Sequence, residues 1–291
     1  MLTEIKAEIP PESVESADSF LLELGNGCWS LLEDAIARRA WIVGIFEDEA
    51  KASAGWADLK AALPGPPPGD PVFKALGRRD WAESYRDHFH AWQFGRLHWV
   101  PAWERKSFQV PPGHSVLWLD PGLAFGTGNH ETTRLCVERL VALAEGSGDR
   151  RSGTAVIDAG CGSGILALSA ALLGFGDILG FDNDPEAVRV SGENAVFNGL
   201  GDRVTFRTSD LALGLAGGKA GVVLANIQAD ILVAFRRELT SAVAPGGALV
   251  LSGILAHERD AVLAAFRGAA PGWPAETRVL GEWADVMLLR G

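Results

Sequence analysis

From residue 154 onward the sequence alternates short apolar runs with helix-like segments, and this alternation restricts the fold more than any other feature. Runs such as 154–160 and 221–226 are rich in valine, isoleucine and leucine, and they have the length of buried strands. Strands that alternate with crossover helices form a parallel, doubly wound sheet with helices on both faces. The last two runs, 277–283 and 284–290, predict an antiparallel hairpin that closes this sheet.

The first 77 residues follow a different order. We expect helices over 12–24 and 50–63, and strands over 2–9, 28–34, 40–48 and 72–76. The order βαββαβ is that of a small ferredoxin-like α+β domain. We therefore predict three parts: a small α+β domain over 1–77, a linker helix over 78–93, and an α/β domain with a mainly parallel, Rossmann-like sheet over 94–291.

Two further expectations concern the α/β domain. We assign the apolar runs 97–103 and 114–121 to the same alternation of strands and helices, and we expect one uninterrupted helix over 230–243.

Charge and composition exclude several classes of function. The formal charge of −11 opposes binding to nucleic acid, which relies on lysine and arginine, and favours a basic protein partner. The N-terminal sequence is acidic where a signal peptide is basic, and the most apolar stretch, 165–181, is interrupted by polar residues and glycines. We expect a cytoplasmic monomer that does not bind membranes. Cys28, Cys136 and Cys161 lack metal-site spacing and are expected to be free thiols.

The sequence VIDAGCGSGIL, residues 156–166, is a strand that leads through three glycines into a helix. Glycines let the backbone approach a ligand closely, and the helix N-terminus offers unpaired N–H groups. Asp182 ends the next strand, 22 residues beyond Gly160, where a carboxylate can reach ribose hydroxyls. The pattern GxGxG differs from the dinucleotide pattern GxGxxG, so S-adenosylmethionine fits better than NAD(H).

From Trp81 onward the chain resembles the ribosomal protein L11 methyltransferases, which belong to the class I S-adenosylmethionine-dependent enzymes. The matching sequences are DWAESYRDHF, VPAW, LDPGLAFGTGNHETT, DAGCGSGIL, FDNDPEAV, ENAVFNG, LANIQA, PGG and LSGIL. The resemblance implies a methyltransferase whose partner is ribosomal protein L11 and whose cofactor is S-adenosylmethionine, with no metal. It implies that Thr133, Gly160, Asp182 and Asn226 contact this cofactor. Gly162 and Asn183 belong to the same motifs. Phe125 completes the expected set: it lies in the loop 120–133, which would cover the methionine end of the cofactor, and its ring would shield the sulfonium.

Asn226 is the expected catalytic residue because it ends an apolar strand, at the position from which such sheets present ligand-binding side chains. The residues Ile227, Gln228 and Ala229 follow it, whereas enzymes that methylate flat amides or bases usually have Pro-Pro-aromatic there. An aliphatic amine, lysine or α-amino, is therefore the expected substrate. Its proton is removed through desolvation beside the positive sulfonium, without a dedicated general base.

Several alternatives remain at the level of sequence. His130 is either a general base or a residue that orders its loop, Asp158 either shapes the glycine loop or holds the methionine amine, and Asp210 either reaches the adenine or lies solvated in a turn. The methylated group could also belong to another protein or a small amine, and a binding protein without catalysis is a third class.

Overall fold

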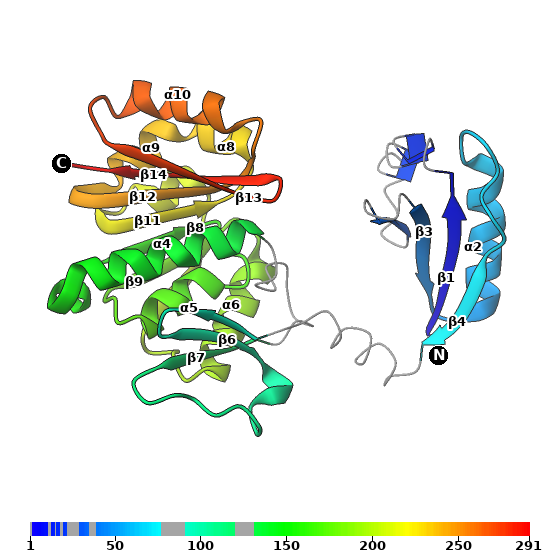
Figure 1. Ribbon diagram of the computed structural model, residues 1–291, viewed down its shortest axis with the longest axis horizontal. Coiled ribbons are helices and arrows are strands. Elements are labelled where there is room, and N and C mark those ends of the chain that lie inside the picture. The colour runs from blue at the N-terminus through cyan, green and yellow to red at the C-terminus, as the bar shows by residue number, and fades with distance from the viewer. Residues whose placement is uncertain are drawn as a thin grey trace. The chain divides into compact units, whose positions relative to one another are not determined.

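A computed structural model describes residues 2–10, 13–14, 16–17, 20–21, 29–34, 39–76, 91–119 and 131–291 of the chain. The chain divides into two compact units, Met1–His88 and Phe89–Gly291. Both are drawn in Figure 1. Within the described residues, no helix has both the length and the apolar character needed to span a membrane.

The first unit is built on an antiparallel sheet in the order β2-β3-β1-β4. Its elements are β1 (Leu2–Ile9), β2 (Trp29–Asp34), β3 (Arg39–Phe46), α2 (Glu49–Ala62) and β4 (Val72–Leu76). Side chains on β1 alternate between buried and exposed, because one face of the sheet is covered. Helix α2 covers that face through Ala52, Trp56 and Leu59, and its N-terminus is capped by Asp48, which accepts the Lys51 N–H at 2.8 Å.

The predicted helix over 12–24 is described only in part. Val14, Ser16, Ala17, Phe20 and Leu21 are helical, and the apolar members of this set pack into the core of the first unit. Gly25 and Cys28 lie outside the described residues.

The second unit contains a seven-stranded sheet in the order β10-β9-β8-β11-β12-β14-β13. The strands are β8 (Val156–Ala159), β9 (Ile178–Asp182), β10 (Val204–Thr208), β11 (Ala220–Asn226), β12 (Val243–Leu255), β13 (Ala275–Leu280) and β14 (Trp283–Leu289). All pairs are parallel except those of β14, which runs antiparallel to both β12 and β13. The predicted doubly wound sheet with a closing hairpin is confirmed.

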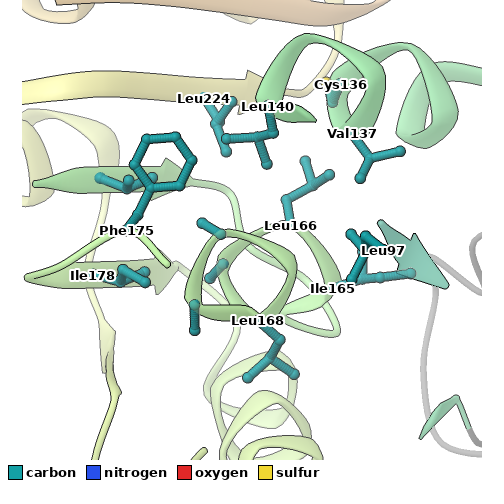
Figure 2. Packing of buried hydrophobic residues seen from close by; sticks show 14 of the residues in the cluster. Leu97, Cys136, Val137, Leu140, Ile165, Leu166, Leu168, Phe175, Ile178 and Leu224 are labelled. Carbon is teal, nitrogen blue, oxygen red and sulfur yellow. The ribbon is translucent and has the colours of Figure 1, made fainter. Parts of the chain in front are cut away.

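Helices cover both faces of this sheet. The helices are α4 (Glu131–Ser147), α5 (Ile165–Leu172), α6 (Pro185–Phe197), α7 (Leu211–Leu215), α8 (Ala229–Ala234), α9 (Arg236–Ser241) and α10 (Arg259–Ala269). Alternate residues of each central strand face opposite cores: Val156 and Leu224 pack against α4 and α5, whereas Ile157 and Val223 pack on the side of α8, α9 and α10. Figure 2 shows the first of these cores, with Leu140 of α4 and Leu166 of α5 close to Leu224.

Three short strands form a separate sheet, which corrects two expectations. Strands β5 (Trp92–Phe94) and β6 (Leu97–Pro101) make a hairpin, and β7 (Ser115–Leu119) lies parallel to β6. Residues 92–93 are therefore strand instead of the end of the predicted linker helix, because Gly95, with φ of 55°, makes a turn that returns the chain. Residues 78–90 of that helix lie outside the described residues.

Strands β6 and β7 lie within the predicted runs 97–103 and 114–121, but neither strand joins the large sheet. They pack on its helices instead, where the buried Trp99 donates its indole N–H to Ser169 Oγ of α5 at 2.9 Å. Residues 102–103 belong to a 3₁₀ helix, and residues 120–121 lie outside the described residues. The predicted helix over 230–243 is also divided, since α8 and α9 are separated at Phe235 and Val243 already begins β12.

Candidate functional site

The predicted site residues converge because β9, β8 and β11 are neighbours in the sheet. Ala159 of β8 lies opposite Phe181 of β9 and opposite Ala225 of β11. The next residue on each strand is Gly160, Asp182 or Asn226, so these three occupy one row at the carboxyl edge of the sheet. Ligands of doubly wound sheets bind at this edge.

The glycine loop has a backbone that other residues would strain. Gly160, Gly162 and Gly164 have φ of 77°, 51° and 78°. A Cβ on Gly160 would lie 2.6 Å from Ile227 Cγ2, and one on Gly164 would lie 2.8 Å from Phe206 Cζ and 2.9 Å from Ser191 Cβ. The loop therefore needs glycine for both conformation and space.

Asp182 holds the glycine loop to the end of β9. Its Oδ2 accepts the Gly162 N–H at 3.0 Å, and its Oδ1 accepts the Asp184 N–H at 3.1 Å. The side chain is partly exposed, and each carboxylate oxygen has a second lone-pair direction with which to accept a hydroxyl. Asn183 follows it and is exposed beside the same edge.

Asp158 is buried beneath the loop, with 1% of its surface exposed. Its Oδ2 accepts the Ala167 N–H at 3.0 Å, which caps α5 in place of Gly164, a residue without a capping side chain. Burial raises the pKa of Asp158 to about 7, the Ala167 hydrogen bond opposes this rise, and the charge of Asp182 adds to it. Asp158 is thus bonded to the first turn of α5, directly after the glycine loop.

Asn226 meets helix α4 at the carboxyl edge. Its Nδ2 donates to Thr133 Oγ1 at 3.4 Å, and Thr133 lies in the first turn of α4 with only 3% of its surface exposed. Two residues 93 positions apart in sequence are thereby brought into contact. Asn226 itself is partly exposed and is accessible from the edge of the sheet.

The remaining candidates divide into two groups. Phe125 and His130 lie outside the described residues. Asp210 is exposed and accepts the Leu213 N–H at 2.8 Å, so it caps α7, a helix that the sequence did not predict. Cys136 and Cys161 are buried free thiols, as expected, and burial raises the pKa of both. Among the described residues, no cluster of three potential metal ligands is present.

The sequence did not predict the role of two asparagines, one in α6 and one directly after its last residue. Asn194 Nδ2 donates to the Ser163 carbonyl of the glycine loop at 2.9 Å. Four residues later, Asn198 accepts the Trp118 N–H at 2.7 Å and donates to the Trp118 carbonyl at 3.0 Å. The spacing of the two asparagines on one helical face was the available signal, because residues four apart point the same way.

Comparisons with known proteins agree with this geometry. Residues 4–290 match the family described as ribosomal protein L11 methyltransferase (PrmA). The chain belongs to this family. It is 38% identical to the ribosomal protein L11 methyltransferase of Geobacter metallireducens over 307 residues, which cover 99% of this chain and 98% of that protein. The corresponding protein of Geobacter sp. (strain M21) is 39% identical, with 90% of each chain covered.

A solved structure agrees as well. The ribosomal protein L11 methylase from Lactobacillus delbrueckii subsp. bulgaricus superposes with a TM-score of 0.60 and 30% identity, covering 69% of this chain and 99% of that one. Membership of the family confirms the class predicted from the motifs, an S-adenosylmethionine-dependent methyltransferase with an α/β sheet. The residues present also fit the cofactor, since the partly exposed carboxylate of Asp182 at this edge has lone pairs with which to accept ribose hydroxyls.

Proposed function

We propose that the enzyme transfers methyl groups to lysine and α-amino groups of ribosomal protein L11, and that Asn226 orients the amine. The observation that carries the proposal is the contact between Asn226 and Thr133 in the row formed with Gly160 and Asp182. Because Asn226 Nδ2 donates to Thr133, Oδ1 of the same amide can accept a hydrogen bond from an incoming amine.

The residues after Asn226 favour an aliphatic amine. Ile227 and Gln228 provide no aromatic ring on which a flat base or amide would stack, and Gln228 begins α8 without a side-chain cap. S-Adenosylmethionine, when bound, supplies an electrophilic methyl group beside a positive sulfur. Around it, we assign Gly160, Gly162, Asp182, Asn183 and Thr133 to cofactor binding, with Phe125 as the residue that excludes water.

The amine must lose its proton before it reacts. For a lysine at pH 7 this costs about 4 to 5 kcal/mol, and for an α-amino group about 1 to 1.5 kcal/mol. Desolvation at the carboxyl edge beside a fixed positive charge lowers the pKa of an amine, which offsets much of this cost. A separate general base is therefore not required, and His130 is assigned no proton transfer.

We assign recognition of the protein substrate to residues 1–77. The net charge of −11 favours a basic partner, because opposite charges accelerate encounter. The unit from Phe89 onward contains the row of site residues, so the first unit is free to serve recognition.

The test is methylation of purified L11 with labelled S-adenosylmethionine, followed by mass spectrometry of the modified peptides. We expect label on lysine and N-terminal amino groups, and a loss of at least about a hundredfold in rate for Asn226→Ala with cofactor affinity changed much less. Label on a different protein in a host lysate, with none on L11, would reject the substrate. An Asn226→Ala enzyme with the full rate would reject the role of this residue.

A further inference from the structure

Ser252 lies beside the contact between Asn226 and Thr133, although the proposed chemistry gives it no part. It is the Cα partner of Asn226 on the neighbouring strand β12, and none of its surface is exposed. A buried hydroxyl in a strand core is retained where it makes a specific hydrogen bond, because desolvation is costly otherwise.

Two hydrogen bonds connect Ser252 to the neighbours of that pair. Its carbonyl oxygen accepts the N–H of Ile227, the residue after Asn226, at 3.2 Å. Its Oγ donates to the carbonyl of Thr132, the residue before Thr133, at 3.1 Å. One buried residue is thus bonded to a direct chain neighbour of each partner in the pair.

Gly253, the residue after Ser252, lets strand β12 approach Ile227 closely. The pairing of β12 with β14 is interrupted between Leu251 and Ile254, and Gly253 within this bulge has φ of 80°. A Cβ at this position would lie 2.4 Å from the Ile227 carbonyl oxygen and 2.9 Å from its carbon. Strand β12 therefore approaches Ile227 so closely that only glycine fits at position 253.

The hydrogen bond between Asn226 and Thr133 is sensitive to small movements of α4. Its length of 3.4 Å is near the upper limit for such a bond. The Ser252 hydroxyl bonds the first turn of α4 directly to β12.

We propose that Ser252 is a positioning residue, whose hydroxyl sets the first turn of α4 and so keeps Thr133 within reach of Asn226. The inference rests on the proposed role of Asn226. Ser252 touches neither substrate nor cofactor and acts only through the two residues that it aligns.

The experiment is a double-mutant cycle with Ser252→Ala, Asn226→Ala and the double variant, measured as kcat/KM for L11 methylation and as the thermal midpoint of unfolding. The fold should survive Ser252→Ala, because the Thr132 carbonyl keeps its helical partner four residues on. We expect Ser252→Ala to lower kcat/KM about tenfold or more in the wild-type background, since small misplacements near reacting groups are costly. In the Asn226→Ala background, Ser252→Ala should change kcat/KM less than about twofold. The thermal midpoint of unfolding should fall by the same amount in both backgrounds.

Ser169→Ala is the matched control. Ser169 is equally buried and also has one side-chain hydrogen bond, with Trp99, but it lies in α5 away from the row. We expect a lower midpoint with kcat/KM unchanged.

Each outcome decides between the two proposals. If Ser252→Ala keeps the wild-type rate while Asn226→Ala loses it, the positioning role is wrong and the proposed function stands. If Ser252→Ala lowers the rate equally in both backgrounds, its effect is general destabilisation and the positioning role is again wrong. If Asn226→Ala keeps the full rate, the role of Asn226 fails first, and the role of Ser252 fails with it.

Discussion

Arg139 of α4 and Asp285 of β14 form a two-point ion pair in which Nε and Nη2 of the arginine donate to the two carboxylate oxygens at 2.8 and 2.9 Å. Only 1% of Arg139 and none of Asp285 is exposed. Arg139 also donates to the exposed Glu276, and Asp285 accepts the Arg278 N–H. With the contacts of Thr132 and Thr133, α4 is thus bonded through side chains to β11, β12 and β14.

Replacing Arg139 by methionine should lower the free energy of unfolding by about 3 to 5 kcal/mol, because Asp285 would remain buried without its counter-charge. Urea denaturation measures the change. Arg189→Met is the matched control: Arg189 pairs with Glu186 and Glu193 on the surface of α6, where water screens ion pairs and they contribute little to stability. Equal losses in the two variants would contradict this account of the buried pair.

The carboxyl group of Asp158 should make stability depend on pH. Its pKa is about 7 in the folded chain against 3.8 for the free group, so between these values the folded state holds a proton that the unfolded state has lost. Stability from this group is fully present below pH 4 and is lost as pH rises through 7. The loss is on the order of 4 kcal/mol. Asp158→Asn should remove this dependence, as seen in urea denaturation at several pH values.

The control for Asp158 is Asp230→Asn, which changes an exposed carboxylate at the start of α8. Its pH profile should follow that of the wild type. Parallel profiles for Asp158→Asn and the wild type would show that Asp158 is already ionised well below pH 7.

Gly164→Ala should weaken both folding and cofactor binding. Alanine is strained at φ of 78°, and its Cβ would meet Phe206 and Ser191 below 3 Å, so we expect a loss of about 1 to 3 kcal/mol in stability. Gly192→Ala, in the interior of α6 with no atom near the new Cβ, should instead stabilise by about 0.5 to 1 kcal/mol. Thermal unfolding measures the stability of the two variants, and calorimetry measures their affinity for S-adenosylmethionine. Equal results for the two variants would contradict the requirement for glycine at position 164.

Asn198→Ala should loosen the free edge of β7. The side chain bonds both the N–H and the carbonyl of Trp118, as a neighbouring strand would, and removing it leaves two main-chain groups without those partners. We expect the free energy of unfolding to fall by about 2 kcal/mol. We also expect faster hydrogen exchange at the Trp118 amide. Exchange that is faster everywhere except at Trp118 would argue against this local role.

The fold was largely predictable because its main signals are local. Apolar runs separated by helical segments predicted the strands from β8 to β12 and their parallel sheet, and the spacing from Gly160 to Asp182 placed two site residues on neighbouring strand ends. The separate sheet of β5, β6 and β7 was not predicted, since its strands have the same apolar character as those of the large sheet. The short helix α7 and the break at Phe235 involve too few residues to produce a periodic pattern.

From the strand pattern alone, the candidate site was predictable for the residues that end strands. Asp182 and Asn226 end apolar runs, so their position at one edge of the sheet could be inferred from topology. Ser252 could not be found in this way, because its role depends on a bulge in β12 and on the first turn of α4, which are 120 residues apart in sequence. The pKa of Asp158 likewise depends on complete burial, which no local pattern reveals.

The interior position of β14 has a consequence for synthesis. Because this strand lies between β12 and β13 and carries Asp285, Arg139 has no buried partner until β14 has been translated. The first unit has its own core and can form while later residues are still being made, since domains fold as units during translation. A nascent chain arrested before β14 should therefore resist protease in its first unit and remain open to cleavage in its second.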